Sequence, residues 1–151
     1  MIVAFCGHSQ INKSMELQEQ ILSLLHNEVG DRPAQMYLGG YGEFDAFAYD
    51  CCKKYKDTHP RVTLVFVSPY LSVGYQKNRL QHEKSRYDEI IYFGIEEKPK
   101  KYAISYRNRY MVEKADVVVA YVSHTWGGAY ATYQHAKRKG KRIFNLVPFE
   151  E

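Results

Sequence analysis

The sequence predicts a Rossmann-like α/β fold, a three-layer sandwich in which helices cover both faces of a mostly parallel sheet. Short, almost continuous apolar runs alternate with amphipathic segments along the chain, as is typical of strands that are buried on both faces. Three of these runs end in turns rich in glycine, histidine or hydroxyl groups, at residues 7–8, 39–40 and 123–128. Ligands of such sheets bind beyond the carboxyl ends of the strands, so the three turns are expected to share one edge.

The first half of the chain is expected to contain three strands and two helices. Ser14 is placed to cap the first helix, in which apolar residues recur at helical spacing until Gly30 ends it. Apolar residues across 44–55 follow the i, i+3, i+4 pattern of a second helix. That spacing puts Cys51 and Cys52 on or near its buried face, as small core residues. The strands are expected over residues 2–6, 35–38 and 61–67.

The second half is expected to continue the alternation of strands and helices. Its strongest strand is 116–122, a run of β-branched and apolar residues. Residues 70–87 are polar, basic and rich in Tyr, and are expected to be partly helical or a flap over the site. No linker or repeat is found, which predicts a single domain over residues 1–151. The other elements are expected at 90–93 (strand), 101–115 (helix), 128–139 (helix) and 142–147 (strand).

Composition limits the class of protein. The 151 residues are 45% hydrophobic and 25% charged, which is typical of a globular domain. The formal net charge of +4 permits an anionic partner without requiring nucleic acid. The three cysteines have neither zinc-site spacing nor a disulfide framework, so we expect a cytoplasmic protein without metal or cofactor. No apolar run approaches the about 20 residues of a membrane span, so no membrane partner is expected.

An early glycine-rich turn combines backbone freedom with acidic side chains. Gly39, Gly40 and Gly42 allow a backbone to approach a ligand closely, because glycine has no side chain. Glu43 and Asp45 follow in the first helical turn, where they would repel a phosphate. They could instead accept hydrogen bonds from ribose hydroxyls, or they could simply favour the positive end of the helix dipole.

A late turn, residues 123–128, contains no acid. The hydroxyls of Ser123 and Thr125, with the N–H groups around Gly127 and Gly128, suit a phosphate at the start of the following helix. This turn is therefore expected to hold phosphate, and the early turn the sugar.

The aromatic and basic residues near these turns leave alternatives open. Trp126 could stack on a base or pack under its loop, and His124 could contact phosphate or be an ordinary surface residue. His8, after Gly7 at the end of the first strand, is a candidate ligand contact or a simple turn residue. The pair Arg107 and Asn108 could supply a phosphate contact, with a surface salt bridge as the alternative for the arginine.

Five segments in this order resemble the SLOG superfamily, a Rossmann-like group that includes the cytokinin-activating phosphoribohydrolases and the bacterial DNA-processing protein A. The best match is to its short bacterial and phage branch. The resemblance implies binding of nucleotides or NAD-derived nucleotides, in some members cleavage of an N-glycosidic bond, and often a dimer. The segments are residues 5–8, 39–45, 107–116, 124–129 and 140–146.

One departure from the family pattern bears on catalysis. The phosphoribohydrolases carry Pro-Gly-Gly-x-Gly-Thr-x-x-Glu at the late turn, with a catalytic Glu, whereas this chain has Gln134 in that place and lacks the second Gly-Thr. An acid for glycoside cleavage could then come only from Glu43 or Asp45. The sequence therefore predicts a module that binds a nucleotide or an ADP-ribose-like ligand. The alternatives are a nucleotide N-glycosidase and a single-stranded-DNA-binding module, with nucleic acid the less favoured partner.

Overall fold

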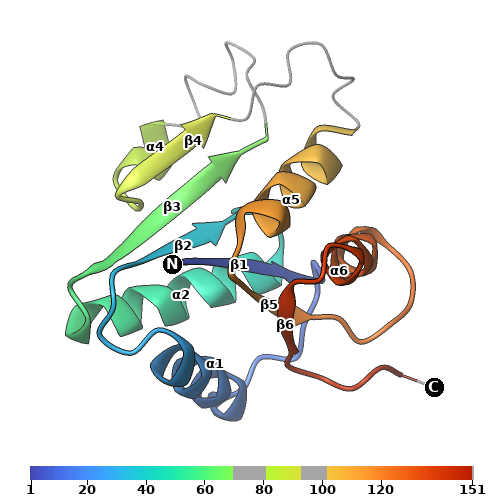
Figure 1. Ribbon diagram of the computed structural model, residues 1–151, viewed down its shortest axis with the longest axis horizontal. Coiled ribbons are helices and arrows are strands. Elements are labelled where there is room, and N and C mark those ends of the chain that lie inside the picture. The colour runs from blue at the N-terminus through green and yellow to red at the C-terminus, as the bar shows by residue number, and fades with distance from the viewer. Residues whose placement is uncertain (70–80, 93–101, 151) are drawn as a thin grey trace.

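The computed structural model describes residues 1–69, 81–92 and 102–150. Within these residues, six strands form one sheet in the order β4-β3-β2-β1-β5-β6, and every neighbouring pair is parallel (Figure 1). The strands are β1 (Ile2–Gly7), β2 (Ala34–Leu38), β3 (Val62–Ser68), β4 (Glu89–Tyr92), β5 (Val117–Tyr121) and β6 (Arg142–Asn145). The helices are α1 (Met15–Glu28), α2 (Glu43–Thr58), α4 (Gln81–Lys84), α5 (Ala103–Lys114) and α6 (Gly128–Arg138).

The fold class expected from the sequence is confirmed, and each expected strand and helix is present. Most boundaries agree within about two residues, which is the usual uncertainty of helix and strand ends. Residues 70–80, the larger part of the segment that was expected to be helical or a flap, lie outside the described residues. The remainder of that segment contains the short helix α4.

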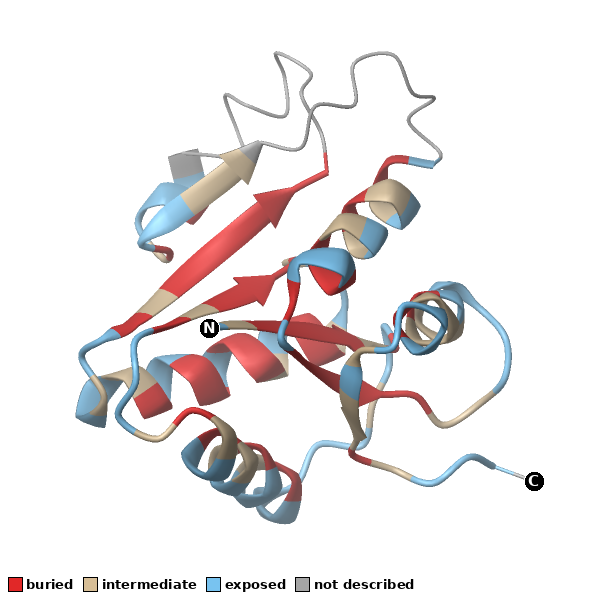
Figure 2. Cartoon of the chain, in the orientation of Figure 1, coloured by how far each residue is buried: buried red, intermediate tan, exposed pale blue. Residues whose placement is uncertain are grey.

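Two hydrophobic clusters occupy the two faces of the sheet. On β1, Val3 and Phe5 belong to the cluster that packs under α1 and α2, whereas Ala4 and Cys6 belong to the cluster under α5 and α6. Figure 1 shows these two helix pairs on opposite sides of the sheet, and Figure 2 shows that the central strands are buried along most of their length. Burial on both faces explains why the strands read as continuous apolar runs.

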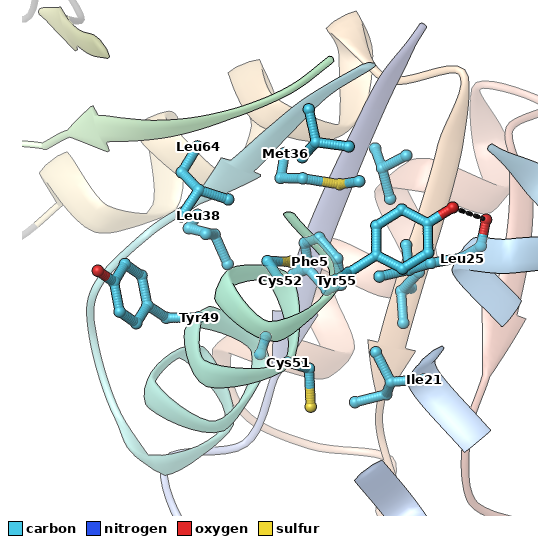
Figure 3. Packing of buried hydrophobic residues seen from close by; sticks show 14 of the residues in the cluster. Phe5, Ile21, Leu25, Met36, Leu38, Tyr49, Cys51, Cys52, Tyr55 and Leu64 are labelled. Atoms are coloured by element: carbon cyan, nitrogen blue, oxygen red, sulfur yellow. Dashed lines mark hydrogen bonds between the residues drawn. The ribbon is translucent and has the colours of Figure 1, made fainter. Parts of the chain in front are cut away.

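The α1–α2 side of the core confirms two expectations from the sequence. Ser14 caps α1, because its hydroxyl accepts a hydrogen bond from the Leu17 N–H at 3.0 Å. Cys51 and Cys52 are buried free thiols of α2 among aliphatic and aromatic side chains (Figure 3), and burial raises the pKa of Cys51 to about 12. The Tyr55 hydroxyl donates to the Gly30 carbonyl at 2.7 Å and lies 3.3 Å from the Leu25 carbonyl, which joins α2 to the C-terminal end of α1 (Figure 3).

The direction of strand order changes between β1 and β5. From β1 the chain adds β2, β3 and β4 on one side, whereas β5 and β6 lie on the other side. Helices that cross to opposite faces leave a crevice at such a switch point, beyond the carboxyl ends of the two strands. Here those ends lead into His8 and Ser123, which places two of the candidate turns side by side.

Candidate functional site

A cleft of about 870 Å³ opens at the switch point, a volume within the range of small-molecule sites. It is formed by the turns after β1 and β5, the start of α6, parts of α2 and α5, and the segment after β6. The candidate residues that line it are Gly7, His8, Asp45, Arg107, Asn108, Ser123, His124, Trp126, Gly127 and Gly128. The candidates that do not line it are Gly39, Gly40, Gly42, Glu43 and Thr125.

The N-terminus of α6 opens into this cleft. Gly127 precedes the helix with φ 90° and ψ 178°, and Gly128 and Ala129 line the cleft. Across the described part of the chain, the N–H groups of Gly128 and Ala129 have no acceptor, and the first turn carries no acid. Free N–H groups and the positive end of the helix dipole therefore face the cleft without a neighbouring carboxylate in that turn.

His8 ties the ends of β1 and β5 together. Its Nε2 accepts a hydrogen bond from the Ser123 N–H at 2.9 Å, so this amide is already used and the ring carries its proton on Nδ1. The backbone N–H of His8 donates to the Tyr121 carbonyl at 3.2 Å. Burial lowers the pKa of His8 and the nearby His124 lowers it further, while Glu150 opposes the shift. His8 is therefore a buried, neutral residue of the cleft wall.

Three aromatic rings, which we call the ring stack, run from the cleft wall outward. His8 stacks on His124 with ring centroids 3.7 Å apart, and His124 stacks on Trp126 at 3.8 Å. Trp126 is 69% exposed, so it does not pack under its loop, one of the two alternatives that the sequence left open. The ring stack fixes the orientation of Trp126 at the mouth of the cleft.

Arg107 is a buried residue of α5 rather than a surface ion pair, although it does line the cleft. Its Nη1 donates to the carbonyls of Gly39 at 2.6 Å and Val67 at 3.0 Å, and its Nε donates to the Asn108 side chain at 2.8 Å. A Cβ on Gly39 would lie 2.8 Å from the guanidinium carbon. The arginine thus holds the ends of β2 and β3, and Gly39 makes room for it.

The two candidate acids of α2 have different environments. Asp45 is buried and lines the cleft; its Oδ2 accepts the Tyr41 N–H at 2.9 Å. Burial raises the pKa of Asp45 from 3.8 to about 6, against the opposing effects of Arg107 and the Tyr41 N–H. Glu43 lies off the cleft, 3.6 Å from the Lys13 ammonium, with its side chain 40% exposed.

Sequence reasoning missed the contribution of the segment after β6. Val147, Pro148 and Glu150 line the cleft, and the Glu150 N–H donates to the Ser123 carbonyl at 2.6 Å. Nothing in their residue types signals a site. Asn145 is likewise outside the predicted site residues, although its side chain bonds both the N–H and the carbonyl of Val122, at 3.0 and 2.9 Å. It lies in one of the segments that carry the family resemblance, and that was the only available signal.

Within the described residues, no group of three or more His, Cys, Asp or Glu side chains is arranged to hold a metal ion. None of the described helices combines the length and the hydropathy needed to span a bilayer.

The chain matches no family model and no curated protein. It is nevertheless similar to several solved structures. DNA processing protein A from Streptococcus pneumoniae superimposes with a TM-score of 0.64 and 16% identity, covering 95% of this chain and 49% of that one. The Helicobacter pylori protein of the same name, described for its single-stranded DNA binding mode, gives 0.61 and 17%, covering 96% and 64%. The chain has the Rossmann-like fold of DNA processing protein A.

A second kind of protein shares this fold. The molybdenum cofactor carrier protein from Chlamydomonas reinhardtii matches with a TM-score of 0.55 and 15% identity over 94% of this chain and 73% of that one. The chain spans about half to two thirds of the length of the DNA processing proteins. At these identities the likeness shows the fold, as the SLOG resemblance implied. The ligand, a dimer, a cytoplasmic location and the bacterial or phage branch stay predictions.

Proposed function

We propose that this protein binds a nucleotide or an NAD- or ADP-ribose-derived ligand, as a sensing or sequestering module. A phosphate of the ligand lies at the N–H groups of Gly128 and Ala129, and ribose hydroxyls donate to Asp45. The observation that carries the proposal is the N-terminus of α6, which faces the cleft with free N–H groups and no acid in its first turn.

The test uses a substitution that reverses the charge at this helix start. A Cβ on Gly128 meets no atom within 4 Å, so a side chain is tolerated there. Gly128→Asp places an acid in the first turn of α6, as α2 already has in its own first turn, and Gly128→Asn is a matched neutral control. We expect AMP, NAD or cyclic ADP-ribose at millimolar concentration to raise the melting temperature of the wild type and of Gly128→Asn. Gly128→Asp is expected to bind about tenfold more weakly or worse, through charge repulsion.

Equal ligand affinity of the Gly128→Asp and Gly128→Asn variants would contradict the phosphate assignment. A wild-type protein whose melting temperature responds to none of the three compounds would contradict nucleotide binding itself. Native mass spectrometry of the freshly purified protein gives an independent readout, because a nucleotide carried through purification would appear as added mass and identify itself after denaturation.

Cleavage of an N-glycosidic bond is a second candidate, favoured by the environment of Asp45. A carboxyl with a pKa of about 6 is partly protonated near neutral pH and can protonate the leaving base as the N-glycosidic bond breaks. Water then adds to the ribosyl carbon and gives up a proton, which restores the Asp45 carboxyl. We expect Asp45→Asn to abolish any release of adenine from AMP while still binding AMP, and Glu43→Gln to retain it. Base release that survives Asp45→Asn, or that is lost in Glu43→Gln, would rule out this assignment.

Single-stranded DNA is a third candidate ligand, favoured by the structural likeness to the Helicobacter pylori protein and by the net charge of +4. Binding of a fluorescent oligonucleotide is expected to weaken as salt is raised, because phosphate contacts release counterions. An affinity that does not change with salt would argue against this candidate.

A further inference from the structure

We propose that the outer face of Trp126 is the platform on which the base of the ligand stacks, so that the ligand class is a nucleotide with an aromatic base rather than a sugar phosphate. This inference rests on the proposed function, since it assigns a second part of the same ligand in the same cleft.

The first observation is the exposure of two large aromatic residues at the cleft. Trp126 is 69% and Tyr41 60% exposed, and both line the cleft. The other large hydrophobic residues that are exposed in the described part of the chain do not line it; they are Met1, Met15, Tyr102 and Phe149. A wide apolar ring held in water at the mouth of a cleft is stabilised when a planar ligand covers it.

The second observation is that the tryptophan is held in place from behind. His124 covers one face of the indole at 3.8 Å with an interplanar angle of 18°, and His8 supports His124 in turn. His8 is fixed by its hydrogen bond to the Ser123 N–H. The exposed surface of Trp126 therefore includes the opposite face, and little side-chain freedom is lost when a ligand ring stacks on it.

The third observation is the position of the platform relative to the phosphate site. Trp126 immediately precedes Gly127 and Gly128, and consecutive Cα atoms are about 3.8 Å apart. One short loop thus presents a stacking surface and the free N–H groups of α6 next to each other. A nucleoside monophosphate carries an aromatic base and a phosphate on a single ribose, which matches this arrangement.

The experiment uses Trp126 as its own probe, because it is the only tryptophan in the chain. The wild type is titrated with AMP, with ribose 5-phosphate, which lacks the base, and with adenosine, which lacks the phosphate. We expect AMP to quench the tryptophan fluorescence and to bind about tenfold more tightly than ribose 5-phosphate, since stacking of one base on an aromatic residue contributes about 1–3 kcal/mol. Adenosine is expected to quench at higher concentration, and ribose 5-phosphate to bind without comparable quenching.

Variants measured by calorimetry then separate stacking from phosphate binding. Trp126→Ala is expected to lose about tenfold in affinity for AMP and little for ribose 5-phosphate, with Trp126→Phe between it and the wild type. Met15→Ala removes an equally exposed apolar side chain outside the cleft and is expected to change neither affinity. An unchanged melting temperature in each variant shows that the fold is retained.

The possible failures are distinguishable. Equal affinities for AMP and ribose 5-phosphate, with AMP binding unchanged in Trp126→Ala, would overturn the base platform and leave the phosphate site standing. Binding of none of the three compounds to the wild type would overturn the proposed nucleotide function and this inference with it.

Discussion

The N-termini of α2 and α6 have the same backbone geometry and different surroundings. Gly42 precedes α2 with φ 90° and ψ 174°, and Gly127 precedes α6 with φ 90° and ψ 178°; neither helix has a side-chain cap. At α2 the Glu43 N–H donates to the Ser9 carbonyl at 2.9 Å and the Phe44 N–H to the His8 carbonyl at 3.4 Å. The protein itself therefore occupies the N–H groups of α2.

At α6 the corresponding N–H groups face the cleft. Gly128 and Ala129 bond to no acceptor in the part of the chain that the structure describes. The comparison teaches that a glycine turn before a helix serves two purposes in one sheet. The turn before α2 packs against the sheet edge, whereas the turn before α6 leaves hydrogen-bond donors for an anion. The groups that lie against the first helical turn determine which of these roles the turn has.

The largest expected change in the free energy of unfolding is at the N-terminus of α2, which packs against the end of β1. A Cβ on Gly7 would lie 2.4 Å from the buried ring of Phe44, the second residue of α2. Gly7→Ala is therefore expected to lower the free energy of unfolding by about 3 kcal/mol through overpacking. Gly128→Ala is the matched variant in open space, and is expected to be neutral or slightly stabilising. Urea unfolding measures both, and similar losses would contradict the distinction between a packed and an open helix start.

A second effect is the pH dependence that Asp45 imposes on stability. Its pKa of about 6 in the folded protein lies above the ordinary 3.8, so the folded state binds this proton more tightly than the unfolded state. The wild type should lose stability relative to Asp45→Asn as pH rises from about 4 to about 6, by at most about 3 kcal/mol. Urea unfolding of both proteins at pH 4, 5, 6 and 7 tests this, and a difference that does not change with pH would falsify it.

A smaller effect separates the two capping glycines. Both have φ 90°, a conformation that disfavours alanine and costs about 1–3 kcal/mol at either site. A Cβ on Gly42 would also lie 2.8 Å from the Ser9 Cα, whereas the nearest atom to one on Gly127 is 3.9 Å away. Gly42→Ala should therefore destabilise the protein more than Gly127→Ala, by about 1 kcal/mol or more. Thermal unfolding of the two variants gives the order; equal losses would show that backbone strain alone matters, and the reverse order would contradict the steric argument.

The smallest effect is expected at Glu43. Its ion pair with Lys13 has an N–O distance of 3.6 Å between largely exposed side chains. Glu43→Gln is expected to change the free energy of unfolding by less than about 0.5 kcal/mol and to leave AMP binding unchanged. A tenfold loss of affinity in Glu43→Gln would instead assign a ligand contact to this helix start, and would remove the contrast with α6. Lys13→Gln, which breaks the same ion pair from the other side, controls for the pair itself.

The sheet could be predicted from the sequence because the patterns that mark its strands and helices lie in short stretches of the chain. Strands buried on both faces produce apolar runs, and the switch from runs to helical spacing marks each crossover. Ser14 and Cys52 could be placed in the same way, one from the preference of a helix cap and the other from its helical face. The turns after strands could be assigned to one sheet edge because parallel topology puts them there.

The arrangement within the site depends on contacts between distant residues, which residue types do not reveal. Glu43 and Asp45 stand two positions apart, yet only Asp45 lines the cleft, because successive helical residues point in different directions. Arg107 could not be recognised as buried without knowing that the ends of β2 and β3 meet at its guanidinium. The stacking of His124 on Trp126 depends on how the loop after β5 folds back, which its sequence alone does not determine.

The hydrogen bond from the Ser123 N–H to the His8 ring has a consequence for the order of folding. It joins positions separated by 115 residues, and we expect it to close only after β1 and β5 have paired. The entropy of closing the chain must be overcome before such non-local contacts stabilise the fold. The ring stack rests on His8, so we expect the environment of Trp126 to become native only after this bond has formed. Stopped-flow refolding followed by tryptophan emission should then report the pairing of β1 and β5 rather than the first collapse.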